Sequence, residues 1–245
     1  MNAPARVTHR DSAGDAPAVF LERLRSESQR RYHDQHPFHL RMHQGALSRE
    51  ELRLWVKSRY YYQTRIPIKD ALILAKSEDP AFRRTWLQRI TDHDGRVEGE
   101  GGLALWQRLG EALSIDRAEL VSLSGVLPGV RFACDAYVSL VERAPLVEAV
   151  ASSLTEVLAP DLMERRIAAF ERHYPWIPAQ ALDYFRGRVK AARNDGQFAL
   201  AFVLEHALTR AEQDRCVRAL ITKTEILWHL LDAVEHASGS SRKPG

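Results

Sequence analysis

The sequence predicts an all-α protein that folds as a single compact domain of roughly ten helices joined by short loops. Hydrophobic residues recur at helical spacing along nearly the whole chain, and the alternation that is typical of strands is nearly absent. Several prolines stand at the expected first turn of a helix, where proline is well tolerated. No linker long enough to separate two domains interrupts the 245 residues, and no internal repeat is found.

The central part of the chain begins with a capping box, in which Ser48 and Glu51 satisfy the free amide groups at a helix start. This helix is expected to continue through Trp55 to Arg65. Pro67 is then expected to kink or break it, because proline has no amide proton and its ring clashes with the preceding turn.

The next helix is expected to begin after Asp79, which can cap it, and to run to about His93. Gly95 and the glycine-rich run Gly99–Gly102 should end it and form a flexible link. Later helices are expected to start at Asp116 with Glu119, Leu127-Pro128, Ala144-Pro145, Ala159-Pro160, and Thr209 with Glu212. We therefore expect an all-helical domain over residues 16–236, with flexible ends at 1–15 and 237–245.

Composition and charge exclude several classes of protein. Hydrophobic residues make up 45% and charged residues 27%, as in globular proteins. The net charge of +3 argues against a nucleic-acid partner, and no apolar stretch approaches the roughly 20 residues of a membrane span. The N-terminus does not resemble a secretion signal. Cys134 and Cys216 lie far apart, so we expect no disulfide framework and a cytoplasmic protein.

Polar and cationic side chains recur on helix faces that should be buried. Arg59, Tyr62 and Gln63 share one face because they are spaced by three and four residues. Further residues of this kind are Lys69, Asp70, Arg89, His93, Arg166, Tyr184, Arg188 and Lys223. Taken singly, each is more often a solvated or structural residue. Together they predict a cationic pocket lined by phenol rings, which suits a small polyanion.

Motifs for metals, nucleotides and covalent nucleophiles are absent. None of the 10 histidines has Glu or Asp three residues before it, so the di-iron pattern of helical bundles is missing. The segment His36–His39, with His43 beyond it, contains the helix-disrupting Pro37 and lies near only one carboxylate, Asp34. Glycine-rich phosphate loops and hydrolase motifs are absent, and Cys134 stands in an apolar segment. We therefore expect neither a metal ion nor a bound cofactor.

Six long segments occur in order between about residues 20 and 236. They are YHDQHPFHLRMHQG from Tyr32, WVKSRYYYQTRIPIKDA from Trp55, RRTWLQRITDHDG from Arg83, LPGVRFACDAY from Leu127, SSLTEVLAP from Ser152, and HYPWI from His173. These segments resemble the pyrroloquinoline-quinone synthase family. The resemblance implies a heme-oxygenase-like bundle of about seven main helices, usually a homodimer.

The resemblance also implies an oxidase that uses no cofactor. Its substrate is a tricarboxylated amino-quinone precursor, 3a-(2-amino-2-carboxyethyl)-4,5-dioxo-hexahydroquinoline-7,9-dicarboxylate. The enzyme closes a ring and removes eight electrons, with dioxygen as the acceptor, and releases hydrogen peroxide and pyrroloquinoline quinone. Three carboxylates explain the several Arg and Lys residues, and a reduced quinoid substrate can itself give electrons to oxygen.

Carried over position by position, the resemblance implies two groups of site residues. The substrate pocket falls on Tyr32, His33, Arg59, Tyr62, Gln63, Lys69, Arg89, Tyr137, Thr155, Glu156, Arg166 and Lys223. The residues expected to face dioxygen, which we call the oxygen side, are His93, Tyr184 and Arg188. In this assignment Arg59, Lys69, Arg166 and Lys223 hold carboxylates. His93 and Arg188 stabilise reduced oxygen species, and Tyr184 donates a proton.

Three departures from the family pattern affect the acid–base chemistry. Met163 stands where some members have a histidine, and a thioether cannot accept a proton. The base for ring closure must then be His33, His93 or water. The segment Asp195–Ala199 replaces a Glu-His pair, and Val97 stands where a second histidine can occur. The departures leave room for an oxidase with an altered substrate.

Other functions on the same bundle remain as alternatives. A heme-degrading oxygenase would use His33 or His43 as axial ligand, and a thiaminase-like hydrolase would need a reactive cysteine that this chain lacks. A non-catalytic protein that binds or carries the quinone is the alternative from a different class, and the departure at Met163 favours it. Oxygen uptake and peroxide release distinguish the synthase from the carrier.

Overall fold

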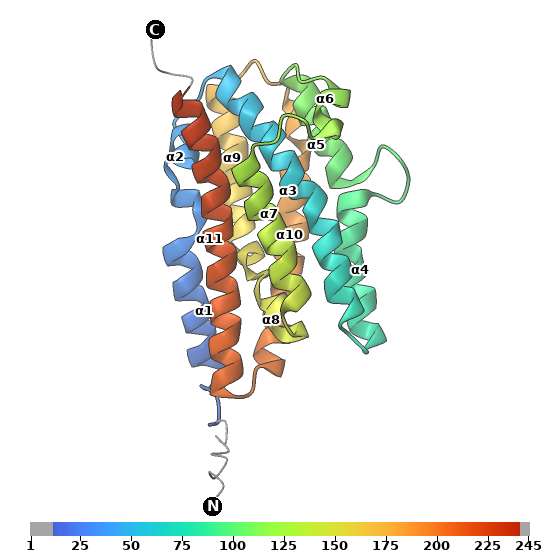
Figure 1. Ribbon diagram of the computed structural model, residues 1–245, viewed down its shortest axis with the longest axis vertical. Coiled ribbons are helices and arrows are strands. Elements are labelled where there is room, and N and C mark those ends of the chain that lie inside the picture. The colour runs from blue at the N-terminus through green and yellow to red at the C-terminus, as the bar shows by residue number, and fades with distance from the viewer. Residues whose placement is uncertain (1–11, 241–245) are drawn as a thin grey trace, which may run out of the picture.

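The computed structural model describes residues 12–240, which are largely helical and contain no strand (Figure 1). Eight helices in this part have twelve or more residues: α1 (Pro17–Arg31), α3 (Arg49–Ala75), α4 (Pro80–Asp94), α5 (Gly101–Ala112), α7 (Pro128–Arg143), α9 (Ala159–His173), α10 (Asp183–His206) and α11 (Arg210–Ser240). Shorter elements connect them: η1 (His33–Gln35), α2 (Pro37–His43), α6 (Arg117–Ser122), α8 (Leu146–Ala151), η2 (Leu154–Leu158) and η3 (Ala179–Leu182). The predicted all-α fold is confirmed.

The cap residues act as their positions in the sequence predict. The Ser48 hydroxyl accepts a hydrogen bond from the Glu51 amide at 3.2 Å, and the Glu51 carboxylate accepts one from the Ser48 amide at 2.7 Å. This reciprocal pair fixes the start of α3. The Asp79 carboxylate accepts hydrogen bonds from the first amides of α4, so the predicted start of that helix is also confirmed.

Pro67 does not break its helix, so of the two effects predicted for it, a kink or a break, the break is excluded. Helix α3 continues from Arg49 to Ala75 with Pro67 inside it. An internal proline costs about 3 kcal/mol in an isolated helix. Helix α3 packs against α4, α5 and α7, and the apolar surface buried in these contacts outweighs the local cost.

Three other predicted boundaries differ from the structure. The link after α4 is shorter than expected, because Gly101 and Gly102 already belong to α5. The last helix runs to Ser240 and not to His236. Residues 12–15, expected within a flexible segment, are held against the loop before α11, where the Gly14 amide donates to the Leu208 carbonyl at 2.9 Å. The flexible ends predicted for residues 1–11 and 241–245 lie outside the described residues.

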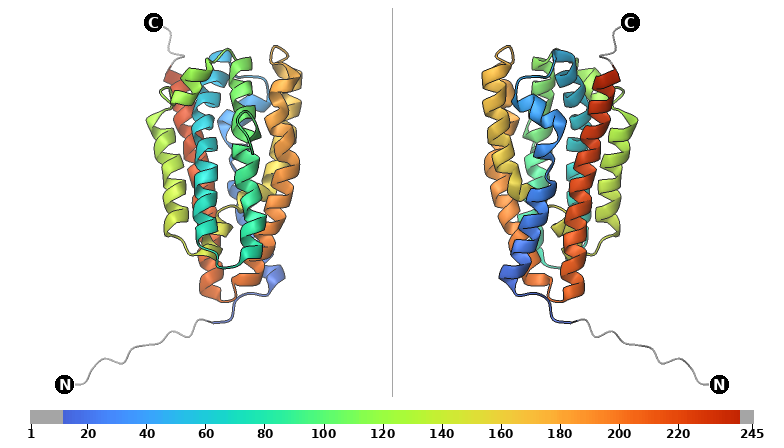
Figure 2. Two further views of the ribbon diagram at one scale, coloured as in Figure 1. Left: turned by 90° about the vertical axis from the view of Figure 1, so that its right-hand side faces the viewer. Right: turned by 90° about the vertical axis from the view of Figure 1, so that its left-hand side faces the viewer.

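Helix α3 lies at the centre of the bundle and carries its polar interior. Helices α4, α5 and α7 pack on α3, α9 packs on α10, and α11 packs on α7 and α1. The long helices run nearly along one common direction (Figure 2). An aromatic cluster of Trp55, Trp106 and Phe185 fills the core on one side of α3. The side chains of Arg59, Gln63 and other polar residues of α3 are also buried, which places charge inside the bundle.

Candidate active site

A cavity of about 40 Å³ lies inside the bundle, and we call it the inner cavity. Its lining contains ten of the fifteen residues that the sequence predicts for the site: Tyr32, His33, Arg59, Tyr62, Gln63, His93, Thr155, Glu156, Tyr184 and Arg188. The other lining side chains are Ile66, Ala159, Leu162, Met163 and Leu227. The remaining five predicted residues, Lys69, Arg89, Tyr137, Arg166 and Lys223, are buried behind this lining.

Three buried cations, one in the lining of the inner cavity and two behind it, form no ion pair with any described residue. The first two are Arg59 on α3 and Lys223 on α11. The Arg59 guanidinium lies 4.0 Å from the centre of the Tyr62 ring. The Lys223 ammonium donates to the Tyr62 hydroxyl at 2.9 Å and lies 3.4 Å from the centre of the Tyr137 ring. Burial, reinforced by Arg59, lowers the pKa of Lys223 well below its usual value.

Arg166 on α9 is the third of these cations and is only 1% exposed. One guanidinium nitrogen lies 3.2 Å from Nε2 of His39, and another lies 3.8 Å from the Met163 sulfur. Its Nε has no hydrogen-bond partner. Burial, with a smaller effect of Arg59, lowers the pKa of Arg166 to about 9. A buried guanidinium without a carboxylate is costly, so these three groups favour an anionic ligand.

Three further cations, by contrast, are already paired with carboxylates. Asp70 accepts hydrogen bonds from the Lys69 ammonium at 2.6 Å and from the Arg89 guanidinium at 3.3 Å. Arg188 donates to Glu156 at 2.8 Å and to Asp195 at 3.2 Å. Lys69, which the resemblance assigns to a substrate carboxylate, is therefore already ion-paired, unlike Arg59, Arg166 and Lys223.

Two histidines that line the inner cavity are buried and neutral. Both ring nitrogens of His33 lack a hydrogen-bond partner, and burial followed by Arg59 lowers its pKa well below 6.5. His93 Nδ1 lies 3.0 Å from the Arg89 carbonyl oxygen, which can only accept, so Nδ1 carries the proton. Burial and then Arg188 lower the pKa of His93 to about 4. Each ring therefore offers a nitrogen that can accept a proton.

Acid–base character differs sharply between the other lining groups. Burial alone would raise the pKa of Glu156, but the Arg188 and Arg89 guanidinium groups outweigh it and lower the pKa to about 2. Tyr184 donates its hydroxyl proton to the Gln63 side-chain oxygen at 2.8 Å, and burial raises its pKa. Glu156 is thus an anion and Tyr184 a protonated phenol at neutral pH.

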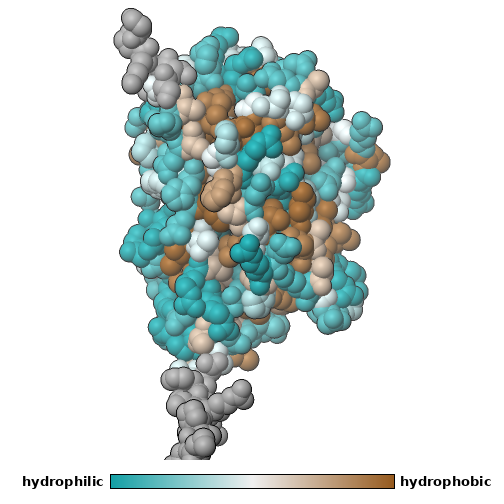
Figure 3. Space-filling model, viewed as in Figure 1, coloured by the Kyte–Doolittle hydropathy of each residue, from teal (hydrophilic) through white to brown (hydrophobic). Residues whose placement is uncertain are grey.

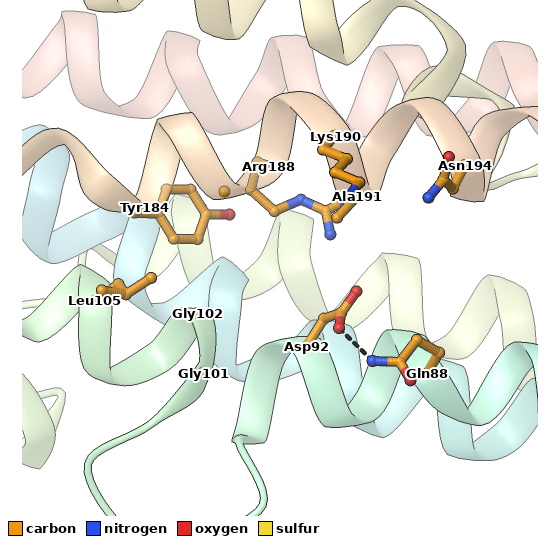
Figure 4. A pocket seen from close by; sticks show the side chains of 11 residues that line it. Gln88, Asp92, Gly101, Gly102, Leu105, Tyr184, Arg188, Lys190, Ala191 and Asn194 are labelled. Carbon is orange, nitrogen blue, oxygen red and sulfur yellow. Dashed lines mark hydrogen bonds between the residues drawn. The ribbon is translucent and has the colours of Figure 1, made fainter.

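A second, wider depression of about 380 Å³ opens on the outside of α4, α5 and α10, and we call it the outer groove. Tyr184 and Arg188 line both the outer groove and the inner cavity. Figure 4 shows these two side chains on α10, across the groove from Gln88 and Asp92. They form the wall between the two spaces, so movement of these side chains would connect them.

Comparison with known proteins decides the family. The family model described as TENA/THI-4/PQQC matches residues 21–233. The chain belongs to the TENA/THI-4/PQQC family. Curated relatives in this family include pyrroloquinoline-quinone synthase of Rhizobium meliloti (strain 1021), 50% identical over 219 residues, which cover 89% of this chain and 86% of the relative. The enzyme of the same name from Pseudomonas aeruginosa is 47% identical over 224 residues, which cover 91% and 90%.

Solved structures support the fold of this family member. A domain of unknown function with a heme oxygenase-like fold from Shewanella denitrificans superposes with a TM-score of 0.75 at 13% identity, over 93% of this chain and 95% of the other. A TenA homolog from Pseudomonas syringae gives 0.72 at 13% identity, over 96% and 98%. The predicted heme-oxygenase-like fold is confirmed.

Two residues that contact the buried arginines of this family member were not among the predicted ones. His39 stands out in the sequence only within the segment His36–His39, where it looks like part of a metal motif. The structure instead brings it to Arg166. Asp195 lies in the segment Asp195–Ala199, where the sequence departs from the family pattern. In the structure it pairs with Arg188 and Arg89. Among residues 12–240, no group of three or more His, Cys, Asp or Glu side chains could hold a metal ion.

Proposed function

We infer that the chain is an enzyme that forms pyrroloquinoline quinone from a tricarboxylated amino-quinone precursor. Relatives of that name are 45–50% identical to it, and the alignments cover about nine tenths of both chains. The structural observation that carries the inference is the set of three buried cations without carboxylate partners. Their number equals the number of carboxylates on the precursor.

Arg59, Arg166 and Lys223 each take one substrate carboxylate in this proposal. A guanidinium binds a carboxylate through two parallel hydrogen bonds, and an ammonium binds it as a point charge. Glu156 is ionised, so it would repel a carboxylate and instead accepts a hydrogen bond from a substrate N–H group. Lys69 and Arg89 act from behind the lining, where Asp70 keeps them in place.

Ring closure requires a group that removes a proton from the substrate, and His33 is that group in this proposal. Met163 also lines the inner cavity, but its thioether has no basic lone pair at neutral pH. His33 is neutral and has no competing hydrogen bond, so its ring can accept a proton. His93 remains on the oxygen side with Arg188 and Tyr184.

Oxidation uses dioxygen as the acceptor and no bound cofactor, because the reduced quinoid substrate supplies the electrons. Arg188 has a guanidinium nitrogen without a partner, and this donor can stabilise negative charge on reduced oxygen. Tyr184 can donate a proton to the same species. Both residues separate the inner cavity from the outer groove, which gives dioxygen and peroxide a short route to solvent.

The inner cavity must widen before a tricyclic ligand fits. Its volume of about 40 Å³ is far below the roughly 300–1,000 Å³ of ligand pockets. Two hydrogen bonds between lining residues of the inner cavity join α10 to other elements. Tyr184 donates to Gln63 on α3, and Arg188 donates to Glu156 on η2. Separation of these contacts, compensated by new contacts with carboxylates, would open the inner cavity toward the outer groove.

Turnover in air tests the proposed function directly. Purified protein mixed with the precursor should consume dioxygen, release hydrogen peroxide and develop the absorbance of pyrroloquinoline quinone. The same mixture without dioxygen should stop at a reduced intermediate. A shift in ligand absorbance with neither oxygen uptake nor peroxide would instead identify the quinone carrier.

Ligand binding should take up protons. His93 is neutral because burial and then Arg188 lower its pKa to about 4, and the negative charge that a tricarboxylate brings into the inner cavity raises that pKa. At pH 6 we expect a net uptake of up to roughly one proton per bound pyrroloquinoline quinone, so affinity should weaken as the pH rises. Calorimetric titrations in buffers of different ionisation enthalpy measure the uptake. His93→Gln should reduce it, and zero uptake or a release of protons would contradict this site.

We also propose that the protein is a cytoplasmic homodimer, as the family resemblance implies. Cys134 and Cys216 are buried free thiols, which suits a reducing compartment. Phe132 on α7 is 81% exposed, and Figure 3 shows hydrophobic patches on the face that carries α7. None of the described helices has a stretch apolar and long enough to cross a bilayer. Sedimentation analysis of the protein and of Phe132→Lys tests the dimer.

A further inference from the structure

Arg166 is held by a partner that carries no charge. The Arg166 guanidinium approaches the His39 ring nitrogen Nε2 at 3.2 Å, and both side chains are 1% exposed. The Met163 sulfur is its only other hydrogen-bond partner among the described residues, at 3.8 Å. The ring of Trp55 lies 5.1 Å below the guanidinium carbon. The position of Arg166 therefore depends mainly on His39.

The hydrogen bonds of His39 determine which ring nitrogen carries its proton. Nδ1 lies 2.9 Å from the main-chain oxygen of His33, and a carbonyl oxygen can only accept. Nδ1 must therefore donate, which leaves the lone pair of Nε2 free to accept from Arg166. Burial and the neighbouring Arg166 keep the pKa of His39 well below 6.5, so the ring stays neutral. One imidazole thus connects the backbone at His33 to the Arg166 guanidinium.

The paired cations at the same site show what a charged partner does. Arg188 is held by Glu156 and Asp195, and Arg89 by Asp70 and Asp195. These carboxylates hold the guanidinium groups in place. Their negative charge also offsets much of the positive charge that the guanidinium groups would otherwise offer to an anionic ligand. His39 fixes Arg166 by a hydrogen bond alone, so the full positive charge remains for an anion in the inner cavity.

We propose that His39 is a positioning residue for anion binding, which holds Arg166 in place beside the inner cavity without neutralising it. His39 does not line the cavity, so it acts on the ligand only through Arg166 and through the backbone of His33. The inference rests on the proposed function, because the anion it serves is a carboxylate of the substrate or product.

The test compares two substitutions of equal size, His39→Gln and His39→Glu. Both can place an oxygen acceptor toward Arg166, but only the glutamate adds a negative charge. We expect the His39→Glu protein to unfold at a temperature no lower than the His39→Gln protein, because its carboxylate pairs with a buried cation. Its dissociation constant for pyrroloquinoline quinone should nevertheless be about 10- to 100-fold higher than that of His39→Gln. Thermal unfolding and absorbance titration give the two quantities.

A merely structural role for His39 predicts a different pattern, in which the two variants bind equally or in which stability and affinity fall together. Either result would overturn the proposal, as would failure of His39→Glu alone to fold. If neither variant folds, the smaller pair His39→Asn and His39→Asp makes the same comparison at the same position, and equal affinity of these two variants overturns the proposal. If the unsubstituted protein does not bind pyrroloquinoline quinone, the proposed function fails as well. If the unsubstituted protein binds pyrroloquinoline quinone and the two His39 variants bind it with equal affinity, only the inference on His39 fails and the proposed function stands.

Discussion

Replacing Arg188 by glutamine should slow dioxygen consumption by about 10²- to 10³-fold, while the dissociation constant for pyrroloquinoline quinone changes by less than about tenfold. The reason is that Arg188 is paired with Glu156 and Asp195, so it contributes little free charge to ground-state binding. Its unpartnered nitrogen can still stabilise charge that develops on oxygen. Oxygen-electrode rates at saturating precursor and absorbance titrations measure the two effects.

A neighbouring arginine on α10 provides the control. Arg186 is half-exposed and pairs with Glu171 and Asp183 at the surface. Arg186→Gln should leave both the rate and the affinity unchanged. If Arg188→Gln weakened binding as much as it slowed oxygen consumption, Arg188 would be a substrate-binding residue and the assignment to the oxygen side would be wrong.

Replacing Asp70 by asparagine should lower the free energy of unfolding by about 3–5 kcal/mol. Asp70 is fully buried and one of its oxygens accepts hydrogen bonds from Lys69, Arg89 and the Trp86 ring nitrogen. Asparagine has the same size but no charge, so Lys69 loses its only ion pair among the described residues. Denaturant unfolding monitored by tryptophan fluorescence and circular dichroism measures the change.

The matched control for Asp70 is an aspartate at the surface. Asp183 forms an exposed ion pair with Arg186, and exposed pairs contribute about 0–1 kcal/mol. Asp183→Asn should therefore change the free energy of unfolding by no more than that. An equally small change for Asp70→Asn would show that Lys69 and Arg89 are not held by the Asp70 charge.

Local spacing allowed much of the site to be predicted from the sequence. Arg59, Tyr62 and Gln63 share a helix face by the period of the α-helix, and all three line the inner cavity. The starts of α3 and α4 follow from local caps in the same way. The predicted break at Pro67 does not occur, because packing against other helices outweighs the local cost of the proline, and the spacing of residues does not reveal that packing.

Pairing of the buried charges could not be predicted from the sequence. Arg166 meets His39 across 127 positions of the chain, and Arg188 meets Glu156 across 32. These contacts depend on how α9 and α10 pack against α2 and η2, so no local pattern encodes them. The distinction between paired and unpaired cations, on which the proposed binding mode depends, therefore emerges only in the folded protein.

The proposed binding mode is tested by a crystal structure of the protein with bound pyrroloquinoline quinone. The ligand should lie inside a widened inner cavity, with one carboxylate within hydrogen-bond distance of each of Arg59, Arg166 and Lys223. A ligand seated in the outer groove, with those three side chains still on Tyr62, Tyr137 and His39 and no carboxylate near them, would contradict it.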